Sequence, residues 1–374
     1  MPNVTYSLLI DGTTAPAEVV AAVQQIEIED HAELADMMRL RLAIGVSEDG
    51  SCWTLIDEGL FERLTEIRIA ITVDNRSETL LTAHVIRTSA TLSNHPGESF
   101  LDVVAMDPTV LMNLEEVVRA WPDMSDSEIA DGIFADPKYD FVPKVKSTGV
   151  QRTLEEHQTI QRGTDIRFLQ QLARRNGYEC YVEIDPENGD PEGHFHPPVL
   201  DQTPQGVLSV NVGESTNVNS FTASYDMLRP TAVKVVGLDI ETQSDQPADA
   251  TGSQLSQLGE ASSVSVDHPR RTLLSQTGLA QAGELQTMAQ AVVEDSAWAI
   301  RAEGDLNTLS YGGILRAKRP VQVRGAGLEF SGTYYVERVL HTINQDGYTQ
   351  RFTLRRNALG IPKQERFVDA EATP

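Results

Sequence analysis

The sequence has 374 residues, of which 40% are hydrophobic and 23% charged, and this composition excludes a wholly disordered or fibrous chain. Asp and Glu number 55 against 30 Lys and Arg, so the formal net charge at pH 7 is -25. A chain this acidic repels phosphate backbones and anionic lipids, so we expect no nucleic-acid recognition. At roughly 150 residues per domain, the length predicts two to three domains.

Membrane and export signals are missing from the sequence. No apolar run reaches the roughly 18 residues that a membrane helix needs, so we expect no membrane insertion. No Lys or Arg precedes Arg39, so we expect no signal peptide and assembly in the cytoplasm. Cys52 and Cys180 are too far apart to predict a metal site or a disulfide framework.

The first third of the chain, residues 1–107, is predicted to form a small antiparallel β-barrel. Period-two apolar patterns indicate strands over residues 6–10, 26–29, 39–44, 67–73, 83–92 and 100–106. Turn sequences separate them, among them Asp11-Gly12 and Asp74-Asn75. Short strands broken by turns are typical of a barrel or sandwich.

Residues 108–225 are predicted to form a mixed α/β middle domain. Ser125 to Glu128 has the sequence of a capping box, which predicts a helix starting there. A second helix is expected from Thr164 to Asn176, where Gly177 fits the left-handed position that ends a helix. A strand is expected over residues 178–184.

The remainder alternates between irregular and regular patterns. Residues 226–310 are expected to hold a linker, a polar loop over 241–268 and a long helix from Leu279 to Ala302. Period-two patterns return over 311–360 and predict the strands of a second barrel, to which parts of 226–310 also contribute. The tail, residues 361–374, looks frayed from Pro362. The predicted fold class is therefore β-rich α+β, with two small barrels around a mixed middle.

Two predicted hairpins, over residues 83–106 and 334–356, share one layout. Each has a strand, a turn that begins with Asn and ends with Gly, and a strand that opens on an aromatic residue. Asn94 and Gly97 correspond to Asn344 and Gly347 at one offset. This shared hairpin layout predicts two similar barrels near the two ends of the chain.

Signatures of catalysis and cofactor binding are weak. His194 and His196 share one face of a predicted strand, but no third metal ligand is apparent, so surface structure is the preferred interpretation. The glycines at 325 and 327 lack the third glycine and the following helix of a dinucleotide loop, which favours a tight turn. We therefore expect no catalytic residue, no cofactor and no metal.

Basic residues gather near the end of the chain. Residues 311–359 contain 8 Lys and Arg against 3 Asp and Glu, a balance of +5, which leaves -30 for the rest of the chain. One interpretation is an ordinary charged strand face. The other is a contact with an acidic region of a partner subunit.

Three segments together resemble the phage late-control D family, the baseplate hub proteins that also form the N-terminal part of VgrG spikes. The first is residues 164–182, TDIRFLQQLARRNGYECYV, and the second is residues 193–198, GHFHPP. The third comprises GTYYVERVLHT at 332–342 and GYTQRFTLRRN at 347–357. Their order and spacing over residues 164–357 make the combination specific.

The resemblance implies a non-enzymatic homotrimer, in which two barrels per subunit form a ring of six. Such a ring matches a sixfold inner tube or tube-initiator protein on one side and a threefold spike, here a separate chain, on the other. Other baseplate components are further expected partners. The predicted contact residues are Ile69, Ile71, His84, Val85, Arg324, Tyr334, Arg338, Arg351 and Arg355. Alternatives are a tail-tip hub or receptor-binding component of a non-contractile phage, or a tail-associated cell-wall hydrolase.

Overall fold

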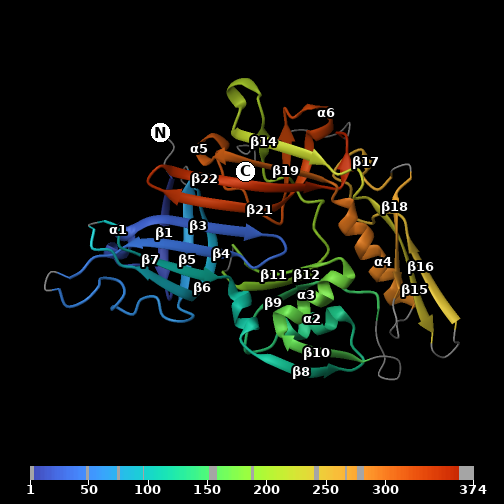
Figure 1. The fold of residues 1–374 in the computed structure, drawn as a ribbon, viewed down its shortest axis with the longest axis horizontal. Coiled ribbons are helices and arrows are strands. Elements are labelled where there is room, and N and C mark those ends of the chain that lie inside the picture. The colour runs from blue at the N-terminus through green and yellow to red at the C-terminus, as the bar shows by residue number, and fades with distance from the viewer. Residues whose placement is uncertain are drawn as a thin grey trace.

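The computed structural model describes residues 4–361 apart from 48–49, 74–75, 96, 151–157, 187–188, 240–243, 266–267 and 276–281. Antiparallel strands dominate, and the longer helices lie in two places, beside the middle sheets and beside β15 (Figure 1). The predicted β-rich α+β class is confirmed. The predicted turn Asp74-Asn75 and the tail from Pro362 lie outside the described residues. None of the described helices is long and apolar enough to span a membrane.

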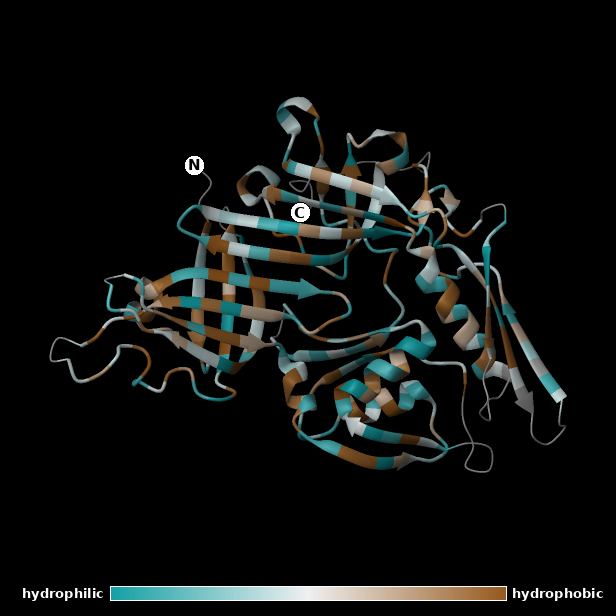
Figure 2. Ribbon diagram, viewed as in Figure 1, coloured by the Kyte–Doolittle hydropathy of each residue, from teal (hydrophilic) through white to brown (hydrophobic). Residues whose placement is uncertain are grey.

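Six strands form the first part of the chain, which we call unit 1. Alternate residues of these strands are apolar (Figure 2) and meet in one core. Ile67, Ile69 and Ile71, for example, are completely buried on one face of their strand, as the period-two pattern predicts. The strands are β1 (Val4–Ile10), β3 (Val23–His31), β4 (Met37–Ala43), β5 (Glu66–Val73), β6 (Arg76–Thr91) and β7 (Phe100–Met106).

Six further strands form unit 2, which has a core of its own. Tyr334, Phe352 and Leu354 are among its buried residues. The strands are β13 (Val207–Ser209), β14 (Val218–Tyr225), β19 (Ile300–Asn307), β20 (Pro320–Arg324), β21 (Gly332–Asn344) and β22 (Gly347–Arg356). Short elements near units 1 and 2 are β2 (Thr13–Thr14), α1 (Ala17–Ala22), η2 (Gly213–Ser215), α5 (Thr308–Tyr311), α6 (Gly327–Phe330) and β23 (Ala358–Leu359).

Units 1 and 2 have the same strand order. The hydrogen-bonded order is β3-β4-β7-β6-β5-β1 in unit 1 and β14-β19-β22-β21-β20-β13 in unit 2. If the six strands of each unit are numbered by their order along the chain, both units have the order second, third, sixth, fifth, fourth and first across the sheet. The units differ at the last pair, because β1 runs antiparallel to β5 whereas β13 runs parallel to β20. The similarity predicted from two hairpins thus extends to six strands.

Two β-bulges also recur at the same places. The fifth and sixth strands shift register between Val85 and Arg87 in unit 1, and between Val336 and Arg338 in unit 2. The second and third strands shift after Val23 in unit 1 and after Val218 in unit 2. Since a bulge fixes the local register of a pair, the bulges align the two units residue by residue.

The two units are joined through a strand pair of their own. The C-terminal half of β21, from Arg338 to Asn344, pairs antiparallel with β3 from His31 to Gln25. Figure 1 shows the result as one continuous layer in which β14, β19, β22, β21, β3, β4 and β7 follow one another. No sheet of the described chain closes into a barrel, because the hydrogen-bonded path stays open from β14 to β2.

The middle of the chain forms a small mixed substructure of helices and short sheets. Its helices pack on short sheets around a core that includes Trp121, Phe134 and Phe195. Both parts of the predicted capping box are present at Ser125. Gly177, with a φ of 68°, ends the second helix. The elements are η1 (Pro108–Asn113), β8 (Glu116–Trp121), α2 (Asp126–Phe134), β9 (Val142–Val145), β10 (Thr159–Thr164), α3 (Asp165–Asn176), β11 (Glu179–Ile184) and β12 (Pro191–His196).

An additional substructure is inserted between β14 and β19. Its helix α4 (Ala282–Ala297) packs on a sheet ordered β16-β15-β18, which projects from the rest of the molecule in Figure 1. The strands of this sheet are β15 (Thr231–Asp239), β16 (Ser244–Ala250) and β18 (Arg270–Ser275), whereas β17 (Ala261–Ser262) pairs with β23.

Two predictions in this region were wrong. The expected loop over 241–268 contains β16, an edge strand that carries Pro247 and buries only small residues such as Ala248; such a strand gives no apolar signal. The expected helix ends at Ala297 rather than Ala302, and Ile300 already belongs to β19. Trp298 and Ile300 are both buried, so this run has no exposed face from which a period can be read. The expected start at Leu279 lies outside the described residues.

Candidate assembly interface

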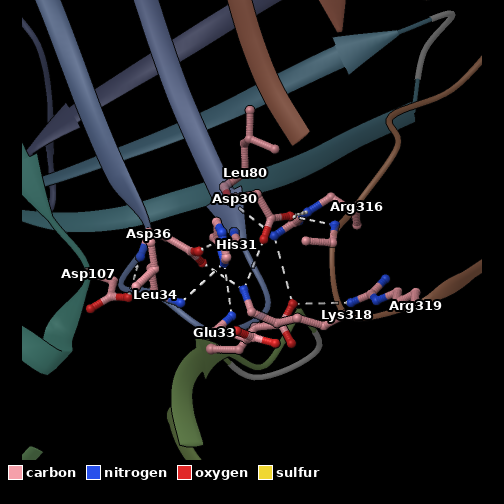
Figure 3. Close-up of polar contacts among 12 residues, drawn as sticks. Asp30, His31, Glu33, Leu34, Asp36, Leu80, Asp107, Arg316, Lys318 and Arg319 are labelled. Atoms are coloured by element: carbon pink, nitrogen blue, oxygen red, sulfur yellow. Dashed lines mark hydrogen bonds and ion pairs between the residues drawn. The ribbon is translucent and has the colours of Figure 1, made fainter. Parts of the chain in front are cut away.

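Buried charges hold unit 2 against unit 1 (Figure 3). The Lys318 ammonium lies 2.9 Å from Asp30 Oδ1 and 2.9 Å from Asp36 Oδ2. Arg316 Nε lies 2.9 Å from Asp30 Oδ2, and its Nη1 lies 2.8 Å from Glu78 Oε1. The Lys318 and Asp30 side chains are 2% and 3% exposed, so this is a desolvated network. Its paired residues are between 238 and 288 positions apart in the chain.

The carboxylates of this network differ in acidity. Burial opposes the ionisation of Asp30, but Lys318 and Arg316 outweigh it and lower the pKa of that group. Burial, with the charges of Asp30 and Asp107 added, raises the pKa of Asp36 despite the attraction of Lys318. Burial also raises the pKa of Asp107, which accepts a hydrogen bond of 2.7 Å from the Asp36 backbone N–H. Asp30 is therefore firmly ionised beside Lys318 and Arg316, whereas Asp36 and Asp107 hold their protons more readily.

The backbone at Lys318 is also unusual. Its φ is 65°, in the left-handed region, where non-glycine residues are uncommon. The Lys318 N–H donates to the Val336 carbonyl at 2.9 Å, and the ammonium is held by two carboxylates. These contacts keep the strained conformation in place.

Other basic residues of unit 2 pair in the same way. Arg355 bonds to Glu179 of the middle domain at 2.8 Å and to Glu33 of unit 1. Arg338 pairs with Glu29, and Arg319 with Glu183. The basic cluster expected to contact a partner subunit is therefore matched largely by acids of its own chain. We call this set of interunit pairs the ionic seam.

The structure separates the predicted contact residues into three groups. Ile69, Ile71, Val85 and Tyr334 are at most 2% exposed, so their side chains pack in the two cores and offer no surface to a partner. Their strands were predicted to face the tube, but these residues lie on the inner face, which period-two alternation cannot distinguish from a contact face.

The second and third groups are polar. Arg338 and Arg355 belong to the ionic seam. His84 is half-buried, with Nδ1 3.3 Å from the Leu64 carbonyl. Arg324 is half-buried and donates to Ser209 Oγ at 2.7 Å, and Arg351 is exposed. The structure thus leaves His84, Arg324 and Arg351 accessible, and it does not bring them together with the buried group.

Among the open strand edges of the described part of the chain are those of β6 and β14, and neither was predicted from the sequence. On one side, β6 pairs with β5 only as far as His84, and its residues from Ile86 to Thr91 are exposed. At the other end of the layer, β14 pairs only with β19. The signal that finds these edges is the repeat, because the equivalent edges of β21 and β3 are paired with each other.

The histidine pair lies as the sequence predicts, on one face of β12. His194 Nδ1 and His196 Nε2 are 3.1 Å apart, and the His194 ring stacks on Tyr181 with centroids separated by 4.6 Å. Burial and the neighbouring His196 lower the pKa of His194 to about 4. Among the described residues, no group of three or more His, Cys, Asp or Glu is placed to hold a metal ion.

Solved structures share this arrangement. The 43 kDa tail protein of prophage MuSo2 from Shewanella oneidensis matches with a TM-score of 0.62 at 13% identity, over 96% of this chain and 100% of its own. A tail protein from Neisseria meningitidis MC58 matches with a TM-score of 0.64 at 12% identity, over 96% and 99%. A component of the type VI secretion system of E. coli matches with 0.55 at 13% identity, over 96% and 78%. The fold is therefore that of phage tail proteins and of a type VI secretion component, which confirms the resemblance to tail proteins drawn from the sequence.

One family model matches most of the chain. The model described as the Alg8 N-terminal domain matches residues 1–345, and the chain belongs to this family. No curated protein matches the chain.

Proposed function

We propose that this chain is the structural baseplate hub of a contractile phage tail or a phage-tail-like injection system. As a homotrimer it would adapt the sixfold inner tube to a threefold central spike formed by a separate protein. Its role would be mechanical rather than enzymatic. The fold shared with tail proteins and with a type VI secretion component supports this proposal.

The repeat of units 1 and 2 is the observation that carries the proposal. One chain has two copies of the same six-strand unit, joined edge to edge by β21 and β3. Three such chains supply six similar units to a ring, which is what a threefold protein needs in order to meet a sixfold one. The ionic seam supports this role, because it fixes the relative position of the two units.

The domain division that we propose is the one predicted from the sequence. Residues 1–107 form the first tube-like, barrel-like domain, and 108–225 form the middle domain together with the first strands of unit 2. Residues 226–310 hold the insertion, and 311–360 complete the second tube-like domain. Of the predicted contact residues, His84, Arg324 and Arg351 are accessible, and we assign them to the tube-facing or baseplate-facing surface.

Native mass measurement of the full chain, alone and with the spike protein encoded beside it, tests the proposal. The chain has a mass of 41.1 kDa, and we expect three copies of it in complex with three copies of the spike chain. Neighbouring sheath and tube genes would agree with a contractile tail. A chain that stays monomeric and ignores the spike protein contradicts the proposal, and clearing of cell walls by the purified chain would favour the hydrolase alternative.

A further inference from the structure

The open edges of β6 and β14 correspond to the two edges that join the units within one chain. In unit 2 the fifth strand, β21, uses its C-terminal half to pair with β3, the second strand of unit 1. The fifth strand of unit 1 is β6, and the second strand of unit 2 is β14. Each has its equivalent edge open in the described chain. The pair of β21 with β3 thus shows how a fifth and a second strand join. The equivalent strands with open edges, β6 and β14, lie at opposite ends of the layer (Figure 1).

The shared bulges give the template a register. Arg338 follows the bulge of β21 and pairs with Thr353, and Arg87 follows the bulge of β6 and pairs with Val104. Arg87 is therefore the equivalent of Arg338. In the same way, Gln25 and Ser220 are equivalent, because each is the first paired residue after its bulge. His31 and Asp226 lie equally far beyond these two residues in the sequence, so they are equivalent as well.

We propose that β6 of one subunit pairs antiparallel with β14 of the next subunit, in the register that places Arg87 opposite Asp226 and Thr91 opposite Thr222. This inference rests on the proposed trimer and specifies how its subunits join. Each subunit would give one edge and receive the other, a head-to-tail contact that closes into a ring. Every joint of that ring would then be the fifth strand of one unit against the second strand of another.

The side chains that meet in this register match in character. On the inner face the pairs would be Leu92 with Phe221, Ala90 with Ala223, and Thr88 with Tyr225. On the outer face they would be Thr91 with Thr222, Ser89 with Ser224, and Arg87 with Asp226. The only charged pair joins opposite charges, and directly opposed pairs of this kind stabilise a sheet.

Two exposed apolar side chains also find partners. Within one chain, the Ala32 N–H donates to the Glu337 carbonyl at 2.9 Å, just beyond the strand pair. The equivalent residues are Met227 and Ile86, which are 64% and 41% exposed. The proposed joint brings these two together and covers both. A slip by one residue would set the inner-face residues of β14 against the outer-face residues of β6, so one register is strongly preferred.

Disulfide trapping tests the joint. Cα atoms of directly opposed antiparallel residues lie about 4.5–5.5 Å apart, which is within the roughly 4.4–6.8 Å that a disulfide bridges. The full chain would carry Ser89→Cys and Ser224→Cys, both at exposed positions, with the exposed Cys52 changed to Ser. We expect oxidation to yield a covalent trimer on a non-reducing gel. The matched control, Ser89→Cys with Ala223→Cys, places the two thiols on opposite faces, and it should remain largely uncrosslinked.

Mass measurement of each unoxidised variant separates this inference from the proposed function. A trimer that fails to crosslink at Ser89 and Ser224, or that crosslinks equally in the control, overturns the joint and leaves the hub proposal standing. A chain that is monomeric with and without the spike protein overturns both. Mixing Ser89→Cys chains with Ser224→Cys chains should give covalent dimers only, because each chain then carries an engineered cysteine at one of its two edges.

Discussion

Lys318 is the residue on which the ionic seam depends. It is the common partner of Asp30 and Asp36, and its side chain is 2% exposed. Replacing it by Met would leave a buried, ionised Asp30 with Arg316 as its remaining basic partner. Removal of one partner of a buried ion pair costs about 3–5 kcal/mol, so we expect Lys318→Met to lower the free energy of unfolding by that order.

Denaturant unfolding of the full chain measures this loss. Lys144 is the matched control, because it also pairs with a carboxylate, Glu192 at 2.9 Å, but its side chain is 47% exposed. We expect Lys144→Met to leave the free energy of unfolding nearly unchanged, because an exposed ion pair contributes little to stability. Equal effects of the two substitutions would show that the seam contributes no more than a surface pair.

His341 should make the stability of the chain depend on pH. It is completely buried, and burial lowers its pKa to about 3, although Asp30 acts in the opposite direction and Arg316 in the same one. Its Nδ1 lies 2.8 Å from the Tyr348 hydroxyl. The unfolded chain takes up a proton below a pH of about 6.5 while the folded chain does not. The stabilisation is therefore complete above that pH and is lost as the pH falls toward 3.

A His341→Gln variant isolates this contribution. Between pH 6.5 and 5 we expect the wild-type chain to lose about 2 kcal/mol more of its free energy of unfolding than the variant does. Gln keeps a partner for Tyr348 but does not titrate. Parallel stability curves for the two proteins would contradict the assignment.

At the scale of elements, the two hairpins share a sequence layout but have different loops. The loop between β21 and β22 is residues 345–346, whereas the loop between β6 and β7 is residues 92–99. Both glycines do have positive φ, 127° at Gly347 and 83° at Gly97, as their turn positions require. The Asn and Gly of the layout therefore predict the turns but not their lengths.

Gly347→Val should impair assembly before it unfolds the monomer. A β-branched residue at this φ costs on the order of 1–3 kcal/mol, and the strained turn ends β21 at the residues that pair with β3. We expect a reduced trimer fraction with a smaller change in the melting temperature. The control is Gln345→Val, in the same exposed turn. Normal assembly of Gly347→Val would contradict the prediction.

At the scale of the whole molecule, the charge distribution has a consequence for association. Each subunit has a formal charge of -25. The ionic seam pairs most of the basic residues of unit 2 within the chain, so few of them remain to attract another subunit. Mutual repulsion opposes association at low salt, and the Debye length falls from about 30 Å at 0.01 M to about 8 Å at 0.15 M.

We therefore expect salt to strengthen the trimer. Sedimentation measurements across this range should give a trimer fraction that rises with ionic strength at constant protein concentration. The Arg87→Ser variant is a useful comparison, because the rise should persist without the one charged pair of the proposed joint. A trimer that weakens as salt is added would point to subunit contacts dominated by ion pairs.

The sequence by itself determined the local structure. Period-two alternation located the strands of unit 1, a capping box located α2, and Gly177 located the end of α3, because each signal depends on residues a few positions apart. The same signals failed at β16, whose edge position needs few apolar residues, and at Ile300, where a fully buried run has no period.

Only the tertiary structure decided how these elements associate. The basic residues near the end of the chain were visible in the sequence, but their partners, such as Asp30 for Lys318, lie hundreds of residues away. The sequence likewise hinted at a repeat from two hairpins, while the equivalence of β21 with β6 and of β3 with β14 required the strand order. Long-range pairing depends on which edges and charges folding brings together, and no local pattern encodes that.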